Sequence, residues 1–82
     1  MKKEYFVYLL KCADGTLYCG YTDNIEKRVE THNSSERGAK YTRSRRPVIL
    51  FYFEKFENKN DALKREYAIK KLSRIEKLNL IS

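Results

Sequence analysis

Apolar and polar positions alternate in a way that predicts three strands and three helices. Two short runs rich in aromatic and β-branched residues flank Ala13-Asp14-Gly15, which is the pattern of a β-hairpin. A third apolar run follows Pro47, and the other apolar residues recur at the spacing of amphipathic helices. The expected strands cover residues 5–12, 16–21 and 48–56, and the expected helices cover 24–32, 60–72 and 73–81.

This order of elements describes a small α/β fold of the α+β type, in which helices cover a three-stranded sheet. The 82 residues suffice for one core and 41% of them are hydrophobic, so we expect a single domain over residues 1–82. Helix starts are marked by side chains that can cap a first turn: Asp23 with Glu26, Asn58 or Asn60, and Ser73 with Glu76.

Tyrosines are concentrated in the hairpin, with Tyr8 on its first strand and Tyr18 on its second. A two-residue turn at Asp14-Gly15 would place these phenols on opposite faces of the sheet. A three-residue loop, with Gly15 in the left-handed conformation, would place both on one face. The sequence allows both registers. We favour the second, because only that register lets the two phenols share a site.

The chain is basic, with 18 Lys and Arg against 11 Asp and Glu and a formal net charge of +7. Such an excess favours polyanions through counterion release, and nucleic acid is the expected partner ahead of an anionic membrane surface. No apolar run approaches the roughly 20 residues that span a bilayer, and no signal peptide is visible. We therefore expect a cytoplasmic protein with no membrane partner.

Glu66 is the most informative charged position, because helical spacing places it between Ala62 and Ile69 on an apolar stripe. A carboxylate there must be paired or bind a cation, since an isolated buried charge is too costly. Two interpretations stay open. Glu66 is either half of a structural ion pair with an arginine or a metal ligand.

Two further groups of residues could contact phosphate. Arg28 and His32 are one helical turn apart, so a guanidinium and an imidazole can face the same ligand, with ordinary helix surface as the alternative. The segment before Pro47 is basic, which is typical either of phosphate contact or of a solvated surface. Its cations are Arg37, Lys40, Arg43, Arg45 and Arg46.

Together these positions resemble the GIY-YIG nuclease superfamily. Phe6-Val7-Tyr8 and Tyr18-Cys19-Gly20 match its two signature tripeptides, with Phe-Val-Tyr in place of Gly-Ile-Tyr. The resemblance extends over residues 5–72. Within the superfamily the chain resembles the small, single-domain bacterial members, and it is similar to the nuclease modules of excision-repair and junction-cutting enzymes. The other matching positions are Tyr21 to Ile25, Arg28, His32-Asn33, Gly38 to Thr42, Pro47 and Glu66.

The resemblance implies a three-stranded antiparallel sheet flanked by helices and the cleavage of phosphodiester bonds. It implies that Glu66 holds one Mg²⁺ or Mn²⁺, with water completing the shell. Tyr18, or as the less favoured choice Tyr8, would activate the attacking water. Arg28 would stabilise charge on the phosphoryl group, and His32 would orient water or assist proton transfer. The residues expected to bind nucleic acid are Arg37, Lys40, Tyr41, Thr42, Arg43, Arg45 and Arg46.

Three functions follow as hypotheses. The first is a metal-dependent endonuclease, acting on DNA ahead of RNA in repair or recombination, with a protein partner that supplies targeting. The second is a nucleic-acid-binding module that keeps the fold and binds without metal-stimulated cleavage. The third is a protein-interaction domain with an acidic partner and little salt-sensitive affinity for DNA.

Overall fold

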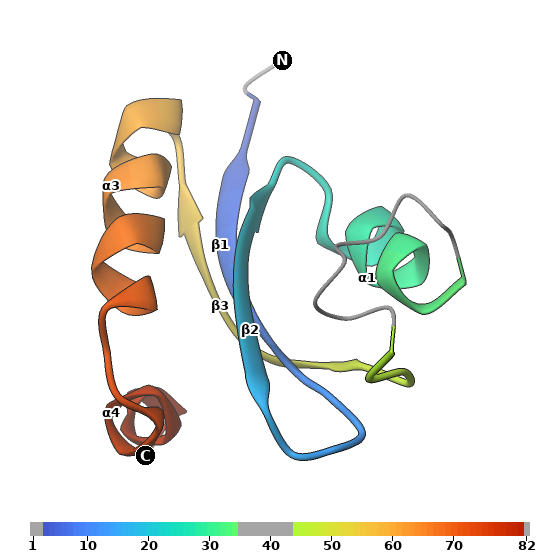
Figure 1. The fold of residues 1–82 in the computed structure, drawn as a ribbon. Helices are drawn as coiled ribbons and strands as arrows, with labels where there is room; N and C mark the ends of the chain where they lie inside the picture. Colours follow the sequence, from blue (N-terminus) through green and yellow to red (C-terminus); the bar gives the residue numbers. More distant parts are fainter. Residues whose placement is uncertain (1–2, 35–43, 82) are drawn as a thin grey trace.

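The structure is a computed structural model that describes residues 3–34 and 44–81 of the chain. Its elements follow the predicted order (Figure 1). They are β1 (Tyr5–Lys11), β2 (Leu17–Thr22), α1 (Ile25–Ser34), β3 (Ile49–Phe56), α3 (Lys59–Lys70), α4 (Arg74–Leu78) and the 3-10 turn η1 (Asn79–Ile81). Among these described segments, no helix has the length and apolar character needed to cross a membrane.

The sheet is three-stranded and antiparallel, in the order β2-β1-β3, which confirms the expected fold. β1 is its central strand, with α3 over one face and α1 toward the other (Figure 1). Strands flank β1 on both sides and helices lie over both faces, so Val7 to Leu10 are almost completely buried. β2 and β3 are the two edge strands.

The β1–β2 hairpin has the three-residue loop that we favoured. The Cys12 amide donates to the Thr16 carbonyl at 2.9 Å, and the Gly15 amide donates to the Cys12 carbonyl at 2.9 Å. Gly15 has a φ of 83°, in the left-handed region that glycine adopts without strain. The resulting register places Tyr8 and Tyr18 on the same face of the sheet.

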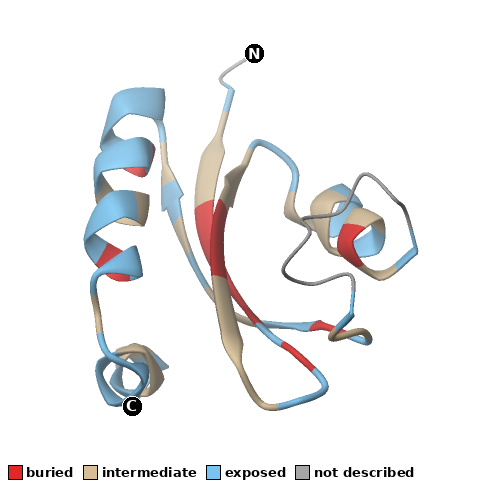
Figure 2. Cartoon of the chain, in the orientation of Figure 1, coloured by how far each residue is buried: buried red, intermediate tan, exposed pale blue. Residues whose placement is uncertain are grey.

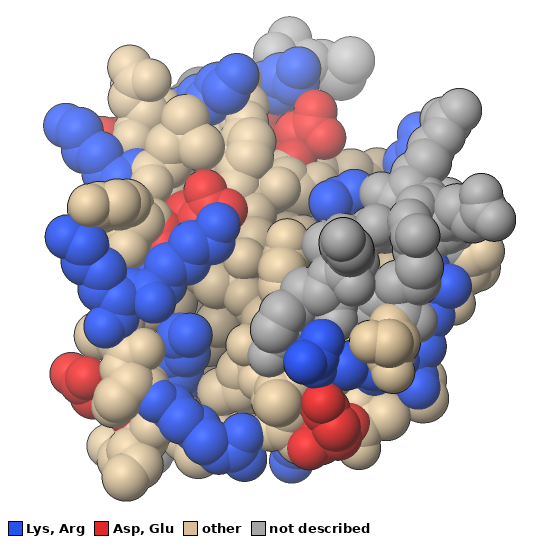
Figure 3. Space-filling view, viewed as in Figure 1, with Lys and Arg blue, Asp and Glu red and all other residues tan. Residues whose placement is uncertain are grey.

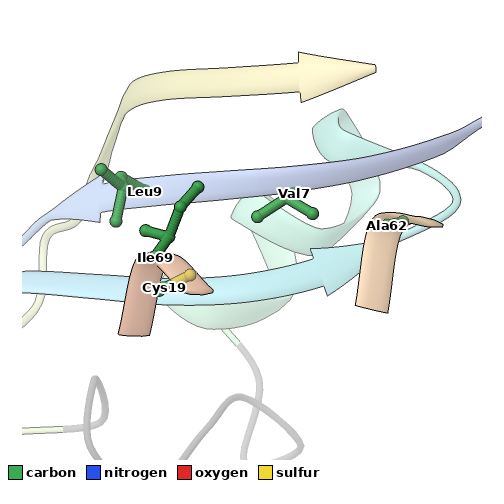
Figure 4. Close-up of a cluster of buried hydrophobic side chains, with 5 residues drawn as sticks. All are labelled: Val7, Leu9, Cys19, Ala62 and Ile69. Atoms are coloured by element: carbon green, nitrogen blue, oxygen red, sulfur yellow. The ribbon is translucent and has the colours of Figure 1, made fainter. Parts of the chain in front are cut away.

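Each face of the sheet has its own core, and Figure 2 shows buried residues concentrated along the central strand. α3 packs on one face through a cluster of buried side chains (Figure 4): Val7, Leu9, Cys19, Ala62 and Ile69. The other face, toward α1, buries a second cluster: Tyr8, Leu10, Cys12 and Val48, with Tyr18 and Val29 packed against it. The two phenols therefore belong to the α1 face.

The helix caps agree with the sequence prediction at two of three positions. Asn58 caps α3, and Ser73 with Glu76 forms the expected capping box of α4. The predicted box of Asp23 with Glu26 is wrong. Asn24 caps α1, because the helix begins at Ile25 and the Asn24 Oδ1 accepts from the Lys27 amide at 3.1 Å.

Two apolar segments are more exposed than an apolar pattern alone indicates. Leu63 follows the buried Ala62 but is 38% exposed, because only a narrow stripe of α3 meets the sheet. The apolar run of β3 is not a central strand. It is an edge strand instead, and Ile49 and Phe53 are 59% and 49% exposed. Near Phe53, a largely apolar hollow of about 360 Å³ separates β3 from the start of α1.

Gly20 is the point at which the Tyr8 side chain crosses β2. The two residues are cross-strand partners, and a Cβ atom at position 20 would lie 2.3 Å from the Tyr8 Oη and 2.5 Å from its Cζ. Tyr8 is 1% exposed, so the phenol has little room to move away. The glycine therefore creates the space that the Tyr8 ring occupies.

We expect Gly20→Ala to lower the free energy of unfolding by about 1–3 kcal/mol, because the new methyl group overpacks against Tyr8. Chemical denaturation of both proteins measures the change. The control is a double-mutant cycle with Tyr8→Leu, whose shorter side chain leaves room for the methyl group. An equal cost of Gly20→Ala in both backgrounds would contradict the steric explanation.

Candidate active site

Tyr8 is the centre of a hydrogen-bonded group on the α1 face. Its Oη lies 3.1 Å from the His32 Nε2, and the Arg28 Nε donates to the same oxygen at 3.4 Å. Arg28 and His32 are one turn apart on α1, as the sequence predicted, and this spacing lets both reach one phenol. The strand tyrosine and the helix pair thus form one unit.

His32 is completely buried, which the alternative of an ordinary helix surface did not predict. Its ring lies between the two tyrosines, with centroids 6.1 Å from Tyr8 and 5.2 Å from Tyr18, in edge-to-face arrangements. The Arg46 Nε donates to the His32 carbonyl. These contacts fix the imidazole against the sheet.

The environment sets the protonation states of this group. Burial, followed by the charges of Arg28 and Arg46, lowers the pKa of His32 to about 4, so the imidazole is neutral at pH 7. Burial raises the pKa of Tyr8 to about 12, although the hydrogen bond and charge of Arg28 oppose the shift. The geometry fits an ordered chain in which Arg28 donates to the phenol oxygen and the phenol donates to the neutral imidazole.

Tyr18 is half-buried on β2, beside His32 and on the same face as Tyr8. It is more accessible than Tyr8, which is sealed between the sheet and α1. The structure therefore confirms the prediction that Tyr8 and Tyr18 lie on the same face of the sheet. The accessible phenol is Tyr18, and the buried, hydrogen-bonded one is Tyr8.

Glu66 approaches this group from α3, on the other side of the sheet. Its side chain is 19% exposed and lies 3.5 Å from the Lys70 Nζ. The Cys19 thiol donates to its carbonyl at 3.8 Å, which holds this turn of α3 against β2. The Glu66 charge is also one of the causes that raise the pKa of Tyr8. Glu66 thus lies beside the edge strand β2, on its α3 side.

The pairing of Glu66 with Lys70 bears on the two open interpretations. The expected structural partner was an arginine on a helix, but Arg65 is bound to Glu54 at 2.9 Å instead. The Lys70 side chain is 53% exposed, and ion pairs with such exposed groups contribute little to stability. Glu66 is thus paired, but with a lysine in place of the expected arginine, and both interpretations stay open.

Among the described residues, the donors around Glu66 suit a metal site completed by water and not a cage of protein ligands. Within residues 3–34 and 44–81, no group of three His, Cys, Asp or Glu side chains could hold an ion. Glu66 offers a single accessible carboxylate. Mg²⁺ and Mn²⁺ accept such a site, because these ions prefer oxygen and Mg²⁺ keeps several waters. A zinc-type cage of three or four protein ligands does not fit these residues.

The predicted basic segment is described only in part. Arg45 donates to the Asp14 carboxylate at 2.9 Å beside the hairpin turn, and Arg46 binds the end of α1. The structure therefore assigns both a packing role that the sequence did not predict. The remaining predicted nucleic-acid contacts lie outside the described residues: Arg37, Lys40, Tyr41, Thr42 and Arg43.

Asn33 is a positioning residue that the residue pattern did not single out as part of the site. Its side chain donates to the Val48 carbonyl at 2.9 Å and accepts from the Val48 amide at 2.7 Å. This pair ties the end of α1, next to His32, to the residue before β3. The only signal in the sequence was the match of His32-Asn33 to the family pattern, because the partner lies in a distant segment.

We expect acid to destabilise the protein through His32. Its pKa is about 4 when folded and about 6.5 when unfolded, so between these values only the unfolded chain binds the proton. The free energy of unfolding should fall by up to roughly 3 kcal/mol as the pH drops through this window. Urea unfolding at each pH measures the slope, and NMR titration of the ring measures the folded pKa.

The chain contains one histidine, so no other imidazole titrates in this window. His32→Gln is the control, and its stability should be nearly flat between pH 6.5 and about 5. A ring that titrates near its ordinary pKa in the folded protein would contradict the prediction.

Comparison with known proteins identifies the fold and its relatives. The family model described as the GIY-YIG catalytic domain matches residues 4–79. UPF0213 protein CPE1444 of Clostridium perfringens is 61% identical over 77 residues, which are 94% of this chain and 82% of the relative. UPF0213 protein DP2720 of Desulfotalea psychrophila is 57% identical over 80 residues, 98% of this chain and 73% of the relative.

Two solved structures have the same fold. The solution NMR structure of UPF0213 protein BH0048 from Bacillus halodurans aligns with a TM-score of 0.61 at 42% identity, covering 95% of this chain and 82% of that one. The solution NMR structure of EF2693 from E. faecalis aligns with a TM-score of 0.66 at 49% identity, covering 98% and 84%. The family model and these relatives together span most of the sequence, and the chain therefore belongs to the GIY-YIG family of nuclease-type domains.

Proposed function

We propose that this chain is a metal-dependent endonuclease that hydrolyses phosphodiester bonds in DNA. The observation that carries the proposal is the Arg28–Tyr8–His32 group on one side of β2, with Tyr18 beside it and Glu66 approaching from α3. A base, a cation for the phosphoryl group and a carboxylate for a metal are what such a hydrolysis needs.

Tyr18 is the better candidate for the group that activates water. Tyr8 is sealed in the core with a pKa of about 12, and its oxygen is already engaged by Arg28 and His32. A buried phenol of high pKa is a poor base at neutral pH. Tyr18 is the more accessible phenol, and its ring makes an edge-to-face contact with His32, with centroids 5.2 Å apart. Tyr8 then acts by positioning Arg28 and His32.

Arg28 is suited to stabilise charge on the phosphoryl group. Its Nε is directed to Tyr8, which holds the guanidinium plane, while the residue also lines an open hollow of about 230 Å³. Thr22, Lys27 and Thr31 line the same hollow. A guanidinium anchored on one side and open on the other is ready to accept an anionic oxygen without further ordering.

Glu66 would hold Mg²⁺ or Mn²⁺, with water filling the other positions. Such an ion, when bound, supplies charge stabilisation for the phosphoryl group and the leaving oxygen. DNA is the proposed substrate ahead of RNA, in repair or recombination, with a protein partner that supplies targeting and a cytoplasmic location. The excess of basic residues favours a polyanionic substrate of this kind.

We expect Glu66→Gln to abolish metal-stimulated cleavage, with a loss of about 100-fold or more, because the amide cannot hold the ion as a carboxylate does. A nicking assay on single-stranded, flapped and four-way DNA with Mg²⁺ or Mn²⁺ measures this. Asp61→Asn is the matched control, since it removes an exposed carboxylate from the same helix. Equal cleavage by Glu66→Gln and the wild type would rule out the proposed metal ligand.

We expect Tyr18→Phe to lose cleavage by about 100-fold or more while DNA affinity is retained, because only the activating hydroxyl is removed. Single-turnover cleavage and a metal-free binding assay separate these two effects. Tyr21→Phe is the control, since Tyr21 lies on the same strand but packs on the α3 face. DNA binding by the wild type with no cleavage under any metal condition would favour the non-catalytic binding module instead.

A further inference from the structure

Three cationic side chains lie around the junction between α3 and α4. Lys70 is the last residue of α3, Arg74 is the first of α4, and Lys77 lies within α4. Figure 3 shows Lys and Arg atoms over these two helices, separated from α1 by the uncharged edge of β2. The neighbouring Glu76 carboxylate accepts from the Ser73 amide at 3.0 Å, so it is occupied in capping α4.

α4 is held against the hairpin that carries Tyr18. The Arg74 Nη1 donates to the carbonyl of Gly15, in the turn between β1 and β2. A hollow of about 210 Å³ lies between them, lined by Thr16, Leu17, Arg74 and Lys77. Thr16 and Leu17 directly precede Tyr18, so this basic hollow continues along β2 from the proposed base.

Two of these cations, Lys70 and Lys77, also act on the middle of β2. Burial raises the pKa of the Cys19 thiol to about 11, and Glu66 raises it further. The charges of Lys70, Lys77 and Arg65 oppose this rise, so their positive field reaches the residue next to Tyr18. Arg65 is bound to Glu54, and the Lys70 Nζ lies 3.5 Å from the Glu66 carboxylate, so Lys77 is the most available of these three cations.

We propose that Lys70, Arg74 and Lys77 form a second contact surface for a sugar–phosphate backbone, so that a bound strand passes from α1 across β2 to α4. The proposal rests on the proposed function, because it places this strand over Tyr18 and Glu66. It adds phosphate contacts on the α4 side, whereas the sequence predicted them at Arg28 and His32 and between Arg37 and Arg46. A flexible polyanion fits such a row, because lysine and arginine contact successive phosphates without reading the base sequence.

The test compares two double variants that each remove two positive charges. Lys70→Gln/Lys77→Gln changes the proposed surface, and Lys59→Gln/Lys64→Gln changes exposed lysines in the first half of α3, away from α4. Arg74 is left intact because it supports the hairpin turn. The probe is a mixed-sequence single-stranded oligodeoxynucleotide in metal-free buffer, titrated over a range of salt concentrations, with thermal unfolding of each variant measured alongside.

We expect the first variant to lose affinity and its slope of log K against log salt to become shallower by about 1.4, at about 0.7 per phosphate contact on a single strand. The control should keep the wild-type slope, with a change well below that of one lost phosphate contact, about 0.7. Lys77→Gln alone should change the slope by about half as much, which separates the surface from the Lys70–Glu66 pair. Equal slopes for the wild type and the first variant would overturn the proposal.

Cleavage assays then distinguish failure of the second contact surface from failure of the nuclease proposal. Wild-type cleavage with equal binding slopes for both double variants would overturn the second surface and leave the nuclease proposal standing. A slope change confined to the first variant, with no cleavage under any metal condition, would support the surface and overturn the nuclease proposal. Absence of salt-sensitive binding by the wild type would overturn both.

Discussion

The packing of Tyr8 across Gly20 is the contact on which the candidate site depends. A side chain at position 20 would occupy the space of the phenol, so the two residues form a single steric unit although they lie on different strands. Through that unit the phenol reaches Arg28 and His32 on α1. The two signature tripeptides are thus the two halves of one packing arrangement, and the helix pair is oriented by it.

The position of β2 at the sheet edge explains how residues from opposite faces can serve one reaction. A central strand would separate the α1 face from α3 by further strands, but β2 has a partner on one side only. The phenols lie on one side of it and Glu66 approaches from the other. Such a site is rigid where it is buried, at Tyr8 and His32, and open where a nucleic-acid strand would have to enter.

Local pattern was sufficient for the order of the elements, because apolar periodicity and turn residues decide it. It left two hairpin registers open, and the three-residue loop was favoured only because it lets Tyr8 and Tyr18 share a site. Local pattern was not sufficient for the burial of His32, the packing roles of Arg45 and Arg46, or the pairing of Asn33 with Val48. These depend on segments that meet only in the folded chain. The edge position of β3 escaped prediction for the same reason, since an apolar run does not reveal how many neighbours a strand has.

Hydrogen bonds between the end of α1 and the segment before β3 hold together the two ends of the connection that joins them. Asn33 binds both backbone groups of Val48, and Arg46 binds the carbonyl of His32, so the two ends of the intervening connection are fastened to each other. Lengthening a connection whose ends are already held costs only about 0.6 kcal/mol for each doubling. The position of the imidazole therefore depends on these two ends and not on the length of the connection between them.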